Sequence, residues 1–384
     1  MRTIVNVCLT GPFSDGFTYQ DNLLPKYQQR LGYRVVVIAP TWRWNKGGSL
    51  EYVPPSRYVN EDKVEIIRIE NDQDKPVGFR FKTYRRLGPL LEEYSPDIVF
   101  LHGLQMRDSG IVARYVKRHA GVRLYVDNHA DNSNSASSWL SKRVLHRLVW
   151  KHYAKKLESV AEAFWGVLPA RVDFLVENYG LPREKCRLLV MGGDDDEVFR
   201  ANKPAVRSSI RGRYGFKEDD FIVVTGGKID KAKRQTLLLM DAVCLMDSHV
   251  KLLIFGPVAP EIKDEFDKKL DPGKMVYISW ANASESYDYF SAADVICFPG
   301  RHSVYWEQAA AMGKPLIVKR WQGAEHVDVC GNVVFLDGDG AREIANALSR
   351  IVKDDEFFSR IESNARIAAT RFLYSDIAKR SIGF

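Results

Sequence analysis

The sequence lacks any hydrophobic run long enough to cross a membrane. Its longest apolar runs, such as Ile98–Leu101 and the Leu-Leu-Ile core of Lys251–Phe255, have the length of strands, whereas a membrane-spanning helix needs about 20 residues. The first residues, Met1–Val7, have the pattern of a strand and not that of a signal peptide. We therefore expect a protein of the cytoplasm.

Cysteine is scarce, and the common cofactor motifs are missing. The 384 residues include five scattered cysteines without a C-x-x-C pair, which is typical of reduced, buried thiols. No metal-ligand spacing occurs, and neither G-x-x-x-x-G-K-[ST] nor G-x-G-x-x-G is present. We therefore expect no metal and no bound cofactor.

Charge is not scarce, and its balance is basic. The formal net charge is +7 and the sequence pI is about 9.0, which favours nucleic acid, an anionic membrane surface or a phosphorylated ligand as partner. No helix-turn-helix, RNA-recognition or zinc-finger pattern accompanies the charge. We therefore expect no nucleic acid as partner.

Strand-like runs alternate with helical patterns along the chain, which predicts parallel α/β sheets with crossover helices. A first series of strands is expected at Ile4–Leu9, Val35–Ala39, Val64–Ile69, Ile98–Leu101, Leu124–Val126, Phe164–Leu168 and Leu188–Met191. A second is expected at Phe221–Thr225, Lys251–Phe255, Met275–Ile278, Val295–Phe298, Leu316–Val318 and Val333–Leu336. Between the two series lies a polar stretch, so we expect one Rossmann-like domain over residues 1–200 and another over 201–384.

The stretch from Ala293 to Pro315 best shows the unit from which the second series is built. A buried strand ends at Pro299-Gly300, and a polar loop follows before the helix formers Glu307–Met312. Ligands of open α/β sheets bind at the carboxyl ends of the strands, so the loop from Gly300 to Val304 is a candidate binding loop.

Each series also begins with a glycine-bearing loop after its first strand. The first contains Gly11 and Gly16, and the second reads Gly226-Gly227-Lys228 with Lys233 and Arg234 close behind. Lysines at this edge, near the Gly300–Val304 loop, would suit a diphosphate.

The order of these loops resembles the retaining GT-B glycosyltransferases of family 4 (glycosyl transferases group 1). The family's G-R-[LI]-x-x-x-K is similar to Gly227-Lys228-Ile229 with Lys233, and its N-G-V-D-x-x-x-F to Gly193–Phe199. The family's E-A-M-A-x-G-x-P is similar to Gln308–Pro315, and a strand-end histidine corresponds to His129.

The resemblance implies two Rossmann-like domains facing a central cleft, an acceptor site in the first domain and a nucleotide-sugar site in the second. It also implies that the last helix crosses back to the first domain. His129, Lys228 and Lys233 would be catalytic. The donor would be held by Gly16, Gly227, Arg301, His302, Ser303, Val304, Glu307 and Gln308.

One departure from the family is clear. The two glutamates of its E-x7-E element are replaced by Gly300 and Gln308. Gln308 can still hydrogen-bond a ribose hydroxyl, but without the charge of a carboxylate. Glu307 lies one residue earlier and about 100° around the helix.

A basic segment runs from Trp139 to Leu157. Leu140, Val144, Leu148 and Val149 repeat at helical spacing, and six lysines and arginines occupy much of the rest. This composition favours a helix lying on anionic lipid at the inner face of the plasma membrane, and a solvated basic face of an ordinary domain helix is the alternative.

The sequence thus predicts a retaining glycosyltransferase of surface-polysaccharide or glycan synthesis, with UDP as the preferred donor nucleotide and a saccharide or lipid-linked saccharide as acceptor. Two alternatives stay open. Gly300 and Gln308 favour a catalytically silent, glycosyltransferase-like binding subunit. A nucleotide-sugar 2-epimerase shares the architecture, but it should show acids placed for elimination, and we find none in the sequence.

Overall fold

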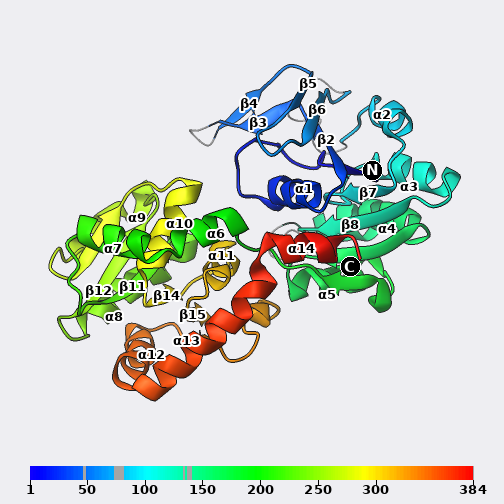
Figure 1. Cartoon of the computed structure of the whole chain (residues 1–384). Helices are drawn as coiled ribbons and strands as arrows, with labels where there is room; N and C mark the ends of the chain where they lie inside the picture. The colour runs from blue at the N-terminus through cyan, green and yellow to red at the C-terminus, as the bar shows by residue number, and fades with distance from the viewer. Residues whose placement is uncertain (46–48, 73–81, 133–134, 136–140, 384) are drawn as a thin grey trace. The chain divides into compact units, whose positions relative to one another are not determined.

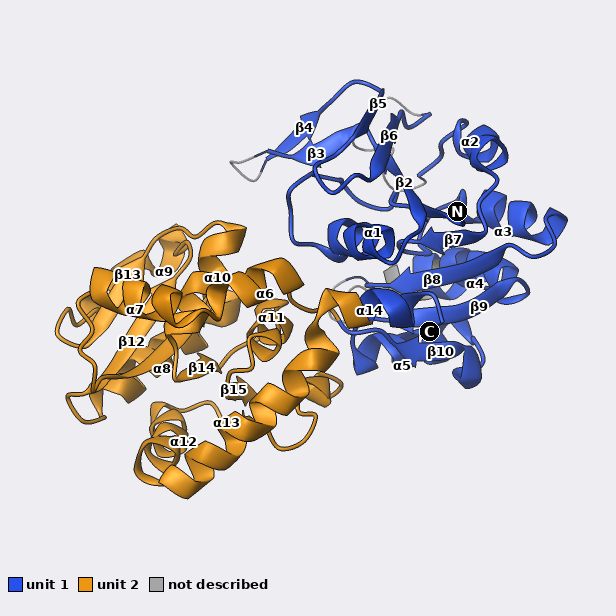
Figure 2. Cartoon of the chain, viewed as in Figure 1, with its two compact units in different colours: residues 1–190, 377–384 blue, residues 191–376 orange. Residues whose placement is uncertain are grey.

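The computed structural model describes residues 1–45, 49–72, 82–132, 135 and 141–383 (Figure 1). The chain divides into two compact units, residues 1–190 with 377–384 and residues 191–376 (Figure 2). Each unit is an α/β domain built on one mainly parallel sheet. The division falls ten residues before the boundary expected from the sequence, and most of the last helix, α14 (Tyr374–Ser381), belongs to the first unit.

The first unit contains an eight-stranded sheet. Its order is β10 (Cys186–Leu188), β9 (Ala161–Gly166), β8 (Arg123–Asn128), β7 (Ile98–Leu101), β1 (Thr3–Val7), β2 (Arg34–Pro40), β6 (Glu65–Ile69) and β5 (Ser56–Val59). The central strands β1 and β7 are buried throughout, as near-continuous apolar runs in a parallel sheet require.

Two features of this unit differ from the all-parallel expectation. Strand β5 pairs antiparallel with β6, and β3 (Trp42–Trp44) forms an antiparallel hairpin with β4 (Leu50–Tyr52). The position of the strand expected at Leu188–Met191 was wrong, because β10 spans Cys186–Leu188. The helices of this unit are α1 (Gln20–Arg30), α2 (Leu87–Tyr94), α3 (Ser109–Arg118), a π-helical segment (Ser141–Trp150), α4 (Lys151–Glu158) and α5 (Pro169–Tyr179).

The second unit contains a six-stranded parallel sheet. Its order is β13 (Met275–Ile278), β12 (Val250–Phe255), β11 (Phe221–Gly226), β14 (Val295–Phe298), β15 (Leu316–Lys319) and β16 (Val333–Leu336). Read in chain order, this is the 3-2-1-4-5-6 sequence of a Rossmann sheet. The direction of winding therefore reverses between β11 and β14.

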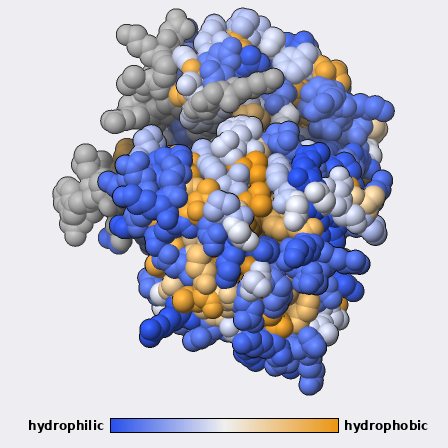
Figure 3. Space-filling model, turned by 90° about the vertical axis from the view of Figure 1, so that its left-hand side faces the viewer, coloured by the Kyte–Doolittle hydropathy of each residue, from blue (hydrophilic) through white to orange (hydrophobic). Residues whose placement is uncertain are grey.

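Helices of the second unit are α6 (Asp195–Ala201), α7 (Pro204–Arg213), α8 (Gln235–Cys244), α9 (Pro260–Lys269), α10 (Ala283–Ala292), α11 (Tyr305–Ala311), α12 (Ala341–Lys353) and α13 (Asp355–Ala369). Local signals set several of their ends. Asp194 caps α6, because its Oδ1 accepts the N–H of Asp196, and Asn282 forms a capping box with Glu285 at α10. On the face drawn in Figure 3, hydrophilic residues frame smaller groups of hydrophobic ones, as on an ordinary water-facing surface.

Candidate functional site

The reversal point of the second sheet brings two loops together. The loop after β11 holds Gly226–Arg234 and the loop after β14 holds Pro299–Val304. A Cβ built on Gly300 would lie 3.1 Å from Oε1 of Gln235 and 3.7 Å from Cα of Lys233. The two loops therefore touch at Gly300, at the edge where α/β sheets bind ligands.

Gly227 and Lys233 form the centre of this contact. Gly227 has φ +104°, which favours glycine. A Cβ there would lie 3.4 Å from the Tyr305 ring and 3.5 Å from Nζ of Lys233. Burial lowers the pKa of Lys233, and Asp230 partly opposes the shift. Among the predicted residues, the structure thus brings together Gly227, Lys233 and the start of the Gly300–Val304 loop.

Lys228 and Arg301 lie in more open positions. The Lys228 side chain is 68% exposed and its Nζ is 3.7 Å from Asp230, and Arg301 is exposed. Ser303 and Val304 contribute backbone carbonyls, which accept from the N–H groups of Trp306 and Gln308 as α11 begins. Lys228 and Arg301 are therefore solvated cations, whereas Lys233 is more enclosed.

Glu307 lies at the centre of a buried cluster with two histidines. Its Oε1 is 2.7 Å from Nε2 of His302 and 2.7 Å from Nε2 of His326. Burial alone would raise the pKa of Glu307, but the two imidazoles outweigh this effect and hold it well below its usual range. The carboxylate is therefore ionised at neutral pH and fixes the orientation of both rings. Sequence reasoning missed His326, which stands on a short turn after β15 and has no motif around it.

Several polar atoms of α11 and its surroundings have no hydrogen-bond partner among the described residues. They are Oε2 of Glu307, Oε1 of Gln308, Oε1 of Gln235, Nδ1 of His326 and Nε1 of Trp306. Buried polar groups are nearly always paired with protein or water. Such a concentration therefore marks a place where water or a ligand completes the hydrogen bonding.

The cluster also has the composition of a metal site. The ligand atoms of His302, Glu307 and His326 lie within 4.8 Å of one another, and two histidines with a glutamate can hold zinc. A zinc-bound imidazole nearly always donates its second ring N–H to an acceptor, but Nδ1 of His326 has no such partner. The residues therefore fit a hydrogen-bonded cluster better than a metal centre.

His129 belongs to a second cluster, in the first unit. At the carboxyl end of β8, Oδ2 of Asp127 is 3.3 Å from Nε2 of His129 and 3.2 Å from Nδ1 of His102. The other oxygen, Oδ1, accepts the backbone N–H of Gly103 at 2.6 Å. Burial raises the pKa of Asp127, but the two imidazoles outweigh it and keep the carboxyl ionised. His129 is 45% exposed, so Asp127 orients a ring that solvent and ligands can reach.

A chain of polar contacts continues from this cluster into the core of the first unit. Nε2 of His102 is 3.1 Å from Oδ1 of Asn6, and Nδ2 of Asn6 donates to Gln28. Nε2 of Gln28 donates to Oγ of Ser381 on α14. The last helix is thus tied to the same network as His129. The signal that could have found His102 is its place directly after the buried run Ile98–Leu101.

Gly16, the remaining predicted donor residue, lies in the loop after β1. Its φ is +73°, and a Cβ built there would meet nothing within 4 Å. Its backbone conformation therefore explains the glycine, with no close approach to another group of this chain.

The predicted basic segment is only partly described. Trp139 and Leu140 lie outside the described residues, as do the side chains of Lys142, Arg143 and Val144. Trp150, Ala154 and Leu157 pack into the core of the first unit, while Lys151, Lys155 and Lys156 are exposed and Leu148 is 65% exposed. Across the described part of the chain, none of the helices has the length and apolar character of a membrane span. Docking of the segment on lipid stays a prediction.

The chain is similar to known proteins in both units. Residues 22–192 match the family described as glycosyl transferase 4-like domain, and residues 220–354 match glycosyl transferases group 1. Mannosylfructose-phosphate synthase of Agrobacterium fabrum is 24% identical over 229 residues, which are 55% of this chain and 50% of that protein. The chain thus spans about half the length of this relative.

Two solved structures share the fold over almost their whole length. Anabaena HepE in complex with UDP and glucose has a TM-score of 0.66 at 16% identity, with 99% of this chain and 98% of that chain covered. A glycosyltransferase from Rickettsia africae has a TM-score of 0.70 at 15% identity, with 99% and 96% covered. At such identities the likeness shows the fold. Together with the two family matches, it establishes that the chain belongs to the group 1 glycosyltransferases of the family-4 type and has their GT-B fold.

Proposed function

We propose that the protein is a retaining glycosyltransferase that moves a sugar from a nucleotide diphosphate, with UDP preferred, to a saccharide or lipid-linked saccharide. The observation that carries this proposal is the contact of the two loops at the reversal point of the second sheet, where Nζ of Lys233 lies beside Gly227 and the Lys233 backbone lies beside Gly300. HepE, of the same fold, was crystallised with UDP.

The chemistry assigned to this site needs fixed positive charge more than a base. The bond between the donor sugar C1 and the diphosphate oxygen breaks, and the acceptor oxygen bonds to C1 from the same face. The acceptor proton passes to the leaving diphosphate. Lys233, with Lys228 and Arg301 from the more open side, stabilises the charge that develops on the diphosphate, so this step is proposed without a metal.

The remaining residues hold the donor. Oε1 of Gln308 accepts from a ribose hydroxyl, which supplies the partner that this buried atom lacks within the chain. His302 and His326, oriented by Glu307, contact the donor sugar in place of the family's first glutamate, which Gly300 replaces. His129 hydrogen-bonds the same sugar, with its ring held by Asp127.

The test is calorimetric titration of UDP into Lys233→Ala, with Lys231→Ala as the matched control from the same turn. Loss of a charge-assisted hydrogen bond should weaken binding by about 1.5–3 kcal/mol in the first variant and hardly at all in the second, since Lys231 is exposed. Unchanged affinity in Lys233→Ala would overturn the assignment. Product analysis by NMR with a panel of UDP-sugars then tests retention of the anomeric configuration.

A catalytically silent subunit is the second candidate, favoured by Gly300 and Gln308 in the E-x7-E positions. Such a subunit would transfer no sugar and hydrolyse no donor with any nucleotide sugar. Slow hydrolysis of one donor that disappears in Lys233→Ala separates the two functions.

A further inference from the structure

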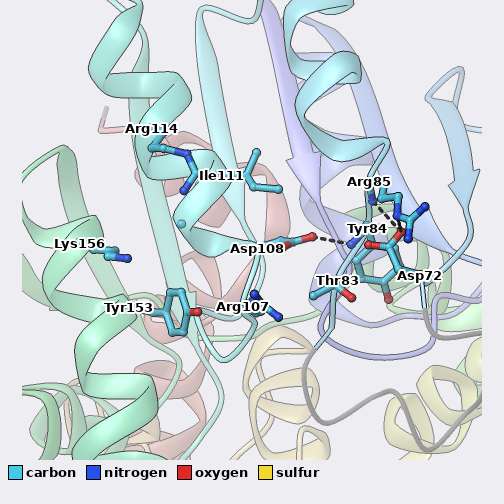
Figure 4. A pocket seen from close by; sticks show the side chains of 11 residues that line it. Asp72, Thr83, Tyr84, Arg85, Arg107, Asp108, Ile111, Arg114, Tyr153 and Lys156 are labelled. Atoms are coloured by element: carbon cyan, nitrogen blue, oxygen red, sulfur yellow. Dashed lines mark hydrogen bonds and ion pairs between the residues drawn. The ribbon is translucent and has the colours of Figure 1, made fainter.

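A further candidate site lies within the first unit. A pocket of about 650 Å³ opens between the segment before α2, the start of α3 and the helix α4 (Figure 4). Ligand pockets usually measure roughly 300–1,000 Å³. The pocket is therefore large enough for a monosaccharide with a charged substituent.

Positive charge dominates the lining. Arg107 precedes α3, Arg114 lies one turn into it, and Lys156 projects from α4 (Figure 4). Among the described residues, none of these three forms an ion pair within 4 Å. Their charges therefore have no salt-bridge partner there, although Nζ of Lys156 lies over the Tyr153 ring, 5.4 Å from its centre.

The two acids of the lining are already engaged. Asp108 accepts the backbone N–H of Tyr84, and Asp72 accepts that of Arg85 and lies 3.8 Å from its side chain. Both carboxylates thus pin the Thr83–Arg85 segment to the wall of the pocket. Neither carboxylate forms an ion pair with Arg107 or Arg114, although attraction to both arginines offsets part of the rise that burial causes in the pKa of Asp108.

An aromatic face completes the pocket. A Cβ on Gly110 would lie 3.5 Å from the ring of Tyr153 and 3.9 Å from Nη1 of Arg114. The ring and the guanidinium therefore both lie close to the backbone of Gly110. Tyr153 is half-buried, so one part of its ring is held by the protein while the rest faces the pocket (Figure 4).

We propose that this pocket binds the phosphoryl group of a phosphorylated saccharide, the acceptor of the reaction, with Tyr153 against the sugar ring. Three terminal oxygens of a phosphate can accept from Arg107, Arg114 and Lys156 at once, and arginine binds phosphate in a bidentate fashion. A carboxylate offers only two oxygens and a single negative charge to the three cations, so a phosphate matches them better. The role as acceptor rests on the proposed glycosyl transfer, but binding itself does not.

The test titrates glucose 6-phosphate, with glucose as the matched neutral probe, into the full chain saturated with UDP, so that the donor site is occupied. Wild type should bind glucose 6-phosphate and not glucose. Arg107→Gln and Arg114→Gln should each weaken binding about tenfold or more. Arg118→Gln, on the same helix but paired with Glu92 and outside the pocket, should change it less than about twofold. Tyr153→Leu should weaken glucose 6-phosphate but leave inorganic phosphate unaffected.

Equal losses in Arg118→Gln and Arg114→Gln would overturn the proposal, because they would indicate long-range charge alone. Tighter binding of glucuronate than of glucose 6-phosphate would overturn the assignment of phosphate. Vesicles that contain phosphatidic acid test whether the phosphate is carried by a lipid or by a soluble saccharide. If the vesicles compete with glucose 6-phosphate for wild type but not for Arg107→Gln, the pocket binds a lipid-borne phosphate. If they do not compete, the ligand is soluble. Titration of glucose 6-phosphate into Lys233→Ala without UDP measures binding to the pocket alone. Its result therefore does not depend on the donor proposal.

Discussion

Each unit of the protein contains a buried carboxylate that faces two imidazoles through one oxygen, and the two clusters differ in the other oxygen. In the first unit, Oδ1 of Asp127 accepts the N–H of Gly103. In the second unit, Oε2 of Glu307 has no partner among the described residues, and neither has Nδ1 of His326. The first cluster is complete as it stands, whereas the second needs water or a ligand.

This difference separates a positioning role from a binding role. Asp127 has all its hydrogen bonds within the protein and presents the exposed ring of His129. Glu307 and its histidines are more deeply buried, with side-chain exposures of 0%, 13% and 2% for Glu307, His302 and His326. We infer that changes at Asp127 act mainly on stability, whereas changes at Glu307 act on ligand binding as well as on stability.

The largest effect is expected for Asp127→Ala. It leaves the Gly103 N–H and two imidazoles without their acceptor, and breaking such a buried charged group costs about 3–5 kcal/mol. Hydrogen exchange measured by mass spectrometry should show the loss in peptides of β1, β7 and β8, while UDP binding by the second unit is unchanged. Asp173→Ala, which removes an exposed pair with Arg183, is the control, and an equal loss there would remove the distinction.

Glu307→Ala should cost less stability, because it orphans two donors instead of three. We expect about 2–4 kcal/mol, confined to peptides of α11 and the turn that bears His326. Affinity for a UDP-sugar should fall at least about tenfold relative to UDP itself, since the two histidines lose their orientation. Loss of stability with an unchanged ratio of the two affinities would show that this cluster is structural like the first.

Acid should weaken both clusters in the same direction. The pKa of each carboxyl is lowered in the folded state, so its contribution is fully present above the ordinary carboxyl range and is lost as pH falls through and below it. Each such group steepens the fall in unfolding free energy by up to about 1.4 kcal/mol per pH unit. Denaturant titrations at several pH values from 6 to 3 measure the unfolding free energy. Plotted against pH, this free energy should fall less steeply for Asp127→Ala than for wild type. An identical dependence on pH would contradict the ionised, buried carboxylate.

Much of the fold could be predicted from the sequence, because parallel strands buried on both faces leave apolar runs. All six strands of the second sheet were predicted near their true places. The edge strand β5 was missed because Ser56–Val59 is polar and mostly exposed. Helices α5 and α7 were missed although Pro169 and Pro204 stand at their first turns, where proline is favoured.

The site could be predicted only in part. Glycines and lysines after a strand carry a local pattern, so Gly227 and Lys233 were predicted together, and the structure places them side by side. The clusters depend on contacts between distant segments: His102 and Asp127 come from neighbouring strands, and His326 meets Glu307 from the far side of β15. No local pattern encodes such contacts. The pocket at Arg107 and Tyr153 is of the same kind, since α3 and α4 are separate in the chain.

The smallest effect is expected at Gln308, where stability and UDP binding should change in opposite directions. In the protein alone its Oε1 is buried without a partner, so Gln308→Leu removes an unpaired acceptor and should leave stability unchanged or slightly higher. If the same oxygen accepts from the ribose, Gln308→Leu should weaken UDP binding by about 1 kcal/mol, whereas Gln308→Glu should keep or strengthen it, because a carboxylate accepts from both hydroxyls. Thermal unfolding and UDP calorimetry on the two variants measure both quantities.

Opposite signs for stability and binding in Gln308→Leu support a ribose ligand at this position. A loss of stability without loss of binding would instead make Gln308 a core residue, and a stronger effect of Glu307→Ala on UDP itself would transfer the ribose contact to Glu307.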